Sequence, residues 1–79
     1  MSGQSVAGER ALAKIRTALG DTRGSAVIER TMRAVDLKTL STPDDCYTFG
    51  QALTSEGGLL EAIGRAIMVQ ALLAGARAA

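Results

Sequence analysis

The sequence predicts an all-α protein, a compact bundle of about four helices in which the last helix is apolar and central. Four segments repeat their apolar residues at intervals near 3.6, and none alternates as a strand does. Hydrophobic residues make up 47% of the chain, yet Tyr47 and Phe49 are its only aromatic residues. A core of small and aliphatic side chains suits closely packed helices. We therefore expect a single helical domain over residues 1–79, with disorder possible at 1–5 and 75–79.

The first helix is expected from about Val6 to Leu19. Gly20 follows it, and glycine commonly ends a helix because it adopts the left-handed conformation freely. Either Ser5 or Gly8 is a candidate for the N-cap. The apolar stripe of this helix comprises Ala11, Leu12, Ile15, Ala18 and Leu19.

The second helix is expected from about Thr22 to Val35, with Asp21 or Ser25 as its N-cap. A longer link joins it to the third helix, and this link is apolar at Leu37 and Leu40. We expect the link to pack against the core as an irregular or 3₁₀ turn.

The third helix has the best-defined start in the chain. Thr42 is a suitable N-cap, Pro43 fits the first helical position, and the carboxylates of Asp44 and Asp45 favour the first turn. We assign these two carboxylates to capping and to the helix dipole rather than to catalysis. The glycines at 57–58 are expected to end the helix and reverse the chain.

The fourth helix is expected from about Leu59 to Ala74, and only Glu61, Arg65 and Gln70 interrupt its apolar surface. A helix this apolar is either buried on most sides or covered by something outside the domain. A transmembrane segment is disfavoured, because a Glu and an Arg near its start would each cost a few kcal/mol in a bilayer. No membrane partner is therefore predicted.

Gly50 and Gly64 fall inside the third and fourth helices, where glycine costs about 1 kcal/mol relative to alanine. The simplest reason to keep both is a close approach of two helix backbones. This interpretation places the third and fourth helices against each other, or the fourth against its counterpart in a second chain.

Most catalytic and metal sites are excluded by composition, because the chain has no histidine and one cysteine. We predict no enzyme, no cofactor and no metal site. Cys46 lies in the first turn of the third helix, where a thiol pKa can be lowered, but it shares an apolar face with Phe49 and Leu53. A buried structural cysteine is the favoured interpretation. The N-terminus lacks the apolar run of a secretory signal, and the free thiol fits a reducing compartment, so a cytoplasmic location is expected.

The favoured function is a non-enzymatic helical interaction module, an adaptor or regulator that pairs with itself as a homodimer or with another helical protein. A domain of this size is marginally stable alone, and neither a disulfide nor a zinc site is available to help it. The alternative is that the apolar residues of the last helix only fill the monomer core. The predicted interface residues are Gly64, Met68, Ala71, Leu72 and Leu73.

The alternative function is a small nucleic-acid-binding regulator. Residues 1–38 carry seven basic and four acidic side chains, a net of +3, whereas the rest of the chain carries a net of −2. A basic patch on the first two helices could contact phosphates. The near-neutral whole favours an ordinary solvated face instead. The candidate residues for this patch are Arg10, Lys14, Arg30 and Arg33.

Overall fold

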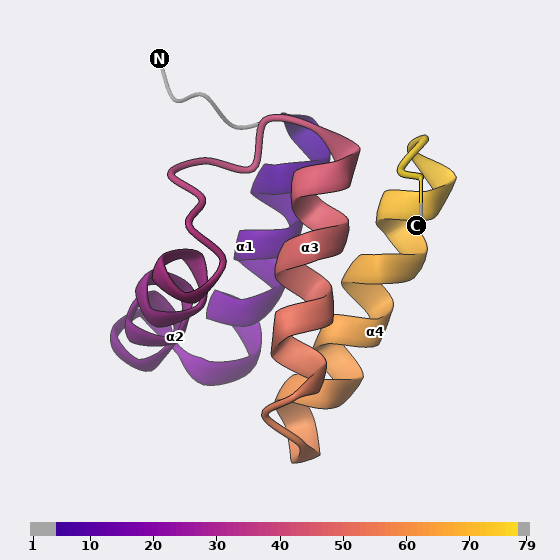
Figure 1. The fold of residues 1–79 in the computed structure, drawn as a ribbon. Coiled ribbons are helices and arrows are strands. Elements are labelled where there is room, and N and C mark those ends of the chain that lie inside the picture. The colour runs from indigo at the N-terminus through magenta and orange to yellow at the C-terminus, as the bar shows by residue number, and fades with distance from the viewer. Residues whose placement is uncertain (1–4, 78–79) are drawn as a thin grey trace.

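The structure, a computed structural model, describes residues 5–77, which form four helices and no strand (Figure 1). The helices are α1 (Val6–Leu19), α2 (Asp21–Ala34), α3 (Pro43–Thr54) and α4 (Gly58–Leu73). The all-α prediction is confirmed. The expected bounds of the first, second and fourth helices agree with the structure to within one residue.

Helices α1 and α3 each contact all three other helices. The most extensive contact is between α3 and α4, which lie side by side (Figure 1). Phe49 and Leu53 of α3 are fully buried in the core, and α4 adds Ile63, Ile67 and Ala71 to it. The four helices thus form the small bundle that the sequence predicts.

Close contact between α3 and α4 depends on the two glycines inside these helices. A Cβ atom on Gly64 would lie 2.5 Å from the carbonyl oxygen of Gly50, and a Cβ on Gly50 would lie 2.8 Å from that of Gly64. Each glycine therefore makes room for the other backbone. Of the two alternatives that the sequence left open, the contact within one chain is confirmed.

The N-cap of α1 is Ser5, and the same residue fastens the link between α2 and α3. The Ser5 Oγ accepts a hydrogen bond from the Gly8 N–H (3.0 Å) and donates one to the Leu40 carbonyl (3.1 Å). Gly8 is packed against Leu40, where a Cβ would overlap the Leu40 carbonyl oxygen. Leu40 is fully buried and Leu37 packs against the core, so the irregular, apolar link is confirmed.

The start of α2 differs from the prediction. Its N-cap is Gly20, which makes no side-chain capping bond, and Asp21 is already the first helical residue. Gly20 has a φ of 87°, a conformation open to glycine, and so reverses the chain between α1 and α2 within one residue. Neither Asp21 nor Ser25 therefore acts as the cap.

The start of α3 agrees with the prediction. Thr42 Oγ1 accepts a hydrogen bond from the Asp45 N–H (3.1 Å), and Asp45 Oδ2 accepts one from the Thr42 N–H (3.3 Å). Pro43 occupies the first helical position. These reciprocal bonds form a capping box, which satisfies two backbone donors that the helix itself leaves free.

The chain after α4 is held in place through residue 77. Gly75 has a φ of 111°, and the N–H groups of Gly75 and Ala76 donate to the carbonyls of Leu72 (3.1 Å) and Ala71 (2.8 Å). This is a Schellman motif. The Arg77 N–H then donates to Asp44 Oδ1 at 2.8 Å, which ties the tail to the start of α3. Of the ends for which the sequence leaves disorder open, residues 1–4 and 78–79 lie outside the described residues.

The contact between Gly50 and Gly64 predicts that a Gly→Ala substitution destabilises this protein, the reverse of its usual effect in a helix. In an exposed helix interior, Gly→Ala raises the free energy of unfolding by up to about 1 kcal/mol. We expect Gly64→Ala to lower it instead, by roughly 1–3 kcal/mol, because the new methyl group meets the Gly50 carbonyl. Urea unfolding monitored by circular dichroism measures this change.

The exposed Ala13 of α1 calibrates the propensity effect in the same protein through Ala13→Gly. A Gly64→Ala variant more stable than the wild type would contradict the close contact of α3 and α4.

Candidate interaction site

The structure divides the predicted interface residues into two groups. Gly64 and Ala71 are buried within the chain, with Ala71 only 1% exposed, so neither lies at the surface of the single chain. Met68 is half-buried, and its side chain lies beside Gly50 of α3. Leu72 and Leu73 are exposed by 45% and 78%. Of the five predicted interface residues, only Leu72 and Leu73 are therefore exposed at the surface.

An apolar row of residues, here called the α4 stripe, runs along the outer face of α4. Its members recur at alternating steps of three and four residues, the spacing with which helices pair in coiled coils. The larger side chains of this row are exposed by 54–78%. Ala62 is exposed and Ala66 is half-buried. The α4 stripe comprises Leu59, Ala62, Ala66, Val69 and Leu73.

Sequence reasoning found only Leu73 of the α4 stripe. The helix is apolar nearly all round, so periodicity alone could not separate an inner face from an outer one. The available signal was Gly64, which had to face Gly50 if the two helices touched. Residues half a turn away from Gly64 are then directed outward, and these include Val69 and Ala62.

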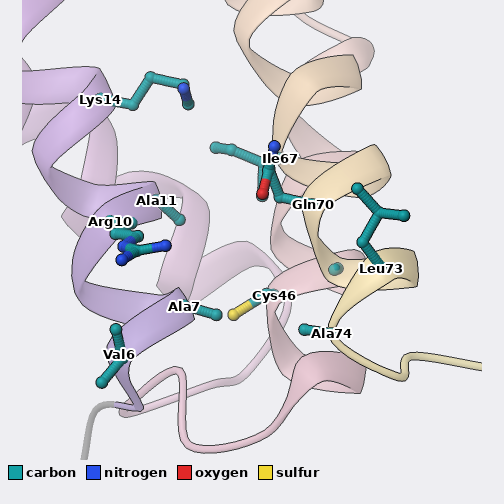
Figure 2. Close-up of a pocket in the computed structure, with 11 residues that line it drawn as sticks. Val6, Ala7, Arg10, Ala11, Lys14, Cys46, Ile67, Gln70, Leu73 and Ala74 are labelled. Atoms are coloured by element: carbon teal, nitrogen blue, oxygen red, sulfur yellow. The ribbon is translucent and has the colours of Figure 1, made fainter.

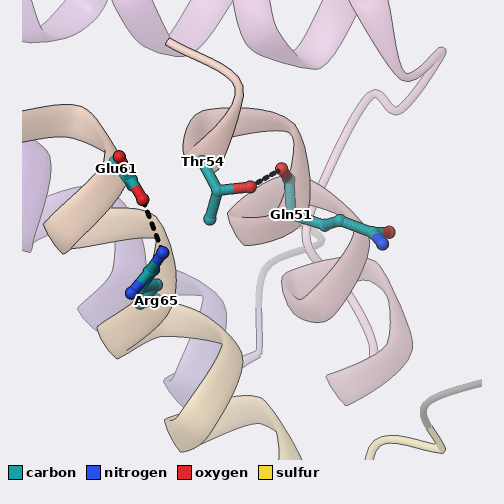
Figure 3. Close-up of polar contacts among 4 residues, drawn as sticks. All are labelled: Gln51, Thr54, Glu61 and Arg65. Atoms are coloured by element: carbon teal, nitrogen blue, oxygen red, sulfur yellow. Dashed lines mark hydrogen bonds and ion pairs between the residues drawn. The ribbon is translucent and has the colours of Figure 1, made fainter. Parts of the chain in front are cut away.

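The two charged residues of α4 pair with each other. Arg65 Nη2 lies 2.6 Å from Glu61 Oε2, one turn apart on the helix, as the sequence predicts (Figure 3). In the last turn of α3, the Thr54 hydroxyl donates a hydrogen bond to the Gln51 carbonyl at 2.6 Å (Figure 3). Since each charge has a partner within α4, no unpaired charge of this helix interrupts the α4 stripe.

A cleft of about 530 Å³ lies between α1 and the C-terminal half of α4 (Figure 2). Its floor is apolar and its rim carries two basic side chains from α1. None of the described residues that line it is acidic. The lining residues are Val6, Ala7, Arg10, Ala11, Lys14, Cys46, Ile67, Gln70, Ala71, Leu73 and Ala74.

The four candidate phosphate-binding residues are not brought to one place. Arg10 and Lys14 line the cleft between α1 and α4. Arg30 lines a second hollow, formed with Leu19 and the start of α4, and its guanidinium is bonded to Glu56 Oε1 at 2.7 Å. Arg33 is exposed on α2. Nucleic-acid binding stays a prediction, and it gains no convergent group of cations from this arrangement.

Cys46 lies at the floor of the cleft and is 1% exposed. Burial raises the pKa of its thiol; a hydrogen bond with the Ser5 side chain acts in the opposite direction, and the charge of Asp45 raises the pKa further. The thiolate, which is the reactive form, is therefore disfavoured at neutral pH. This environment suits the predicted structural cysteine.

The described residues hold neither a cluster of metal-ligating side chains nor a membrane-spanning helix. Within the described chain, no three side chains of the His, Cys, Asp or Glu type lie close enough to hold a metal ion. None of the four helices combines the length and apolarity needed to cross a bilayer. Comparison with protein families, curated proteins and solved structures finds no match.

The burial of Cys46 predicts slow alkylation. We expect iodoacetamide to label Cys46 at neutral pH at least about tenfold more slowly in the native protein than in urea, because burial limits access and disfavours the thiolate. Mass spectrometry of timed samples gives both rates. Equal rates in the two states would show that the thiol is accessible and reactive.

Proposed function

We propose that this protein is a non-enzymatic helical interaction module, an adaptor or regulator, that self-associates as a homodimer through the α4 stripe. One observation carries the proposal: five apolar residues in a continuous row, Leu59 to Leu73, cover the outer face of a helix whose only charges are paired internally. Contiguous apolar surface of this kind is rare on monomers and marks association sites.

The α4 stripe is suited to antiparallel pairing with its own copy. Ala66 lies at its middle, so a twofold axis there would bring Leu59 of one chain opposite Leu73 of the other and Ala62 close to Val69. Small residues at the centre allow the two helices to approach closely, while the leucines fill the ends. Antiparallel helix dipoles also attract each other.

The neutrality of the α4 stripe favours a second copy over another helical protein. A surface adapted to a charged partner normally carries the opposite charge. Here the only charges on α4, Glu61 and Arg65, are already bonded to each other. A surface that is apolar and of similar size at both ends is complementary to itself.

The length of α4 limits the strength of the dimer. Its 16 residues span about 24 Å at 1.5 Å per residue. Two helices of this length bury less area than a standard interface, so we expect a dimer that dissociates on dilution.

Light scattering on a sizing column, over about a tenfold range of concentration, tests the proposal. We expect the wild type to shift from monomer to dimer as concentration rises. Val69→Glu and Ala62→Glu are expected to stay monomeric, because pairing would bury an unpaired carboxylate. Leu72 lies at the edge of the exposed surface, so Leu72→Glu is expected to weaken the dimer less.

Ala13→Glu is the matched control, since it places the same charge on an exposed alanine of α1. It should leave the dimer intact, and circular dichroism should show unchanged helicity for all four variants. A wild type that is monomeric throughout, or equal masses for Val69→Glu and Ala13→Glu, would refute self-association through the α4 stripe.

A further inference from the structure

We propose that the cleft between α1 and α4 binds a small amphiphile, a carboxylate that bears a medium-length aliphatic chain. This inference goes beyond the proposed function and does not depend on it, because the cleft has its own floor and its own charged groups (Figure 2). Leu73 is the one residue that the cleft and the α4 stripe share.

The cleft is hollow because alanine occupies the positions that would otherwise fill it. Ala7 and Ala11 line the cleft from α1, and Ile67, Ala71 and Ala74 line it from the other side. The resulting volume of about 530 Å³ lies within the usual range for sites of small molecules. An aliphatic chain laid on these apolar side chains would lose contact with water, which favours binding.

The charges on the rim favour a negatively charged head group. Arg10 and Lys14 stand one turn apart on α1, and neither takes part in the ion pairs found among the described residues. Across the cleft, Gln70 of α4 offers an amide rather than a carboxylate. A carboxylate held between two cations gains charge-assisted hydrogen bonds, and no acidic lining residue opposes it.

Polarity changes along the cleft, and this orients the ligand. Lys14 lies at one end, whereas Val6 and Ala7 lie at the other, near Ala74 (Figure 2). The head group is therefore assigned to the end with Lys14 and Arg10. The aliphatic chain then runs towards Val6, over the floor that contains Cys46.

The length of the cleft suits an aliphatic chain of medium length. Its lining spans residues 6–14 of α1, about 12 Å at 1.5 Å per residue. A medium-length aliphatic chain matches this dimension.

Titration calorimetry with decanoate, below its micelle concentration, tests the assignment. We expect one decanoate per chain. Decanol and decyltrimethylammonium, which have the same chain without the negative charge, should bind at least about tenfold more weakly, because each lacks the charge-assisted bonds. An Arg10→Gln, Lys14→Gln double variant should lose about the same factor for decanoate while its affinity for decanol stays unchanged.

Two variants separate the cleft from general surface effects. Ala74 is exposed and lines the cleft. Ala74→Leu places a larger side chain there, so it should weaken the binding of both decanoate and decanol. Lys38→Gln removes a charge outside the cleft and should change neither. Decanoate that binds no better than decanol, or binds equally well to Ala74→Leu, would overturn the proposal.

Two parallel experiments test whether the ligand is a free carboxylate or a lipid surface, and whether binding depends on self-association. Sedimentation with phosphatidylglycerol vesicles, without any binding of free decanoate, would replace the proposed ligand by a lipid surface and overturn it. The titration is repeated on Val69→Glu, which should bind decanoate as the wild type does. A dimeric wild type that ignores decanoate refutes this inference alone, and a monomeric wild type that binds decanoate refutes only the proposed function.

Discussion

The backbone contact between Gly50 and Gly64 determines how the rest of the molecule is arranged. Because neither residue has a Cβ, α3 and α4 approach closely enough for one carbonyl to lie against the other helix. This contact fixes the rotation of α4 about its own axis. The inward side then includes Ile63, Ile67 and Ala71, whereas Val69 and Leu73 are left exposed. An apolar helix thereby acquires an inner and an outer face that its composition does not distinguish.

The cleft and the α4 stripe both follow from the position of α3. Both α1 and α4 pack against this helix, and α2 packs against α1 and α3 rather than along α4. No element therefore fills the space between α1 and the end of α4, and the alanines that line it keep it open. The cations of α1 project into the same region. One arrangement of helices thus leaves two different apolar surfaces, one neutral and one with a basic rim.

The sequence predicted the helices well wherever local chemistry determines them. Thr42, Pro43 and Asp45 form the expected start of α3 because capping depends on neighbours within one turn. The predicted N-cap of α2 was wrong, because Gly20 turns the chain through its own backbone conformation and no side chain caps the helix. The predicted interface residues include both buried and exposed positions, because only the contact of α4 with α3 distinguishes the buried Gly64 from the exposed Val69. The cleft could not be predicted, because Arg10 comes to face Gln70 only through the packing of α1 and α4.

The reciprocal glycine contact also constrains how this sequence can change over evolutionary time. A side chain at either position meets the backbone of the opposite helix, so replacing one glycine is not repaired by altering the other. Because the obstacle is a backbone atom and not a side chain, no second substitution can make room for the first. Distant relatives of this chain should therefore be identified by a pair of glycines fourteen positions apart, in two apolar helices joined by a glycine turn, even where little else is retained.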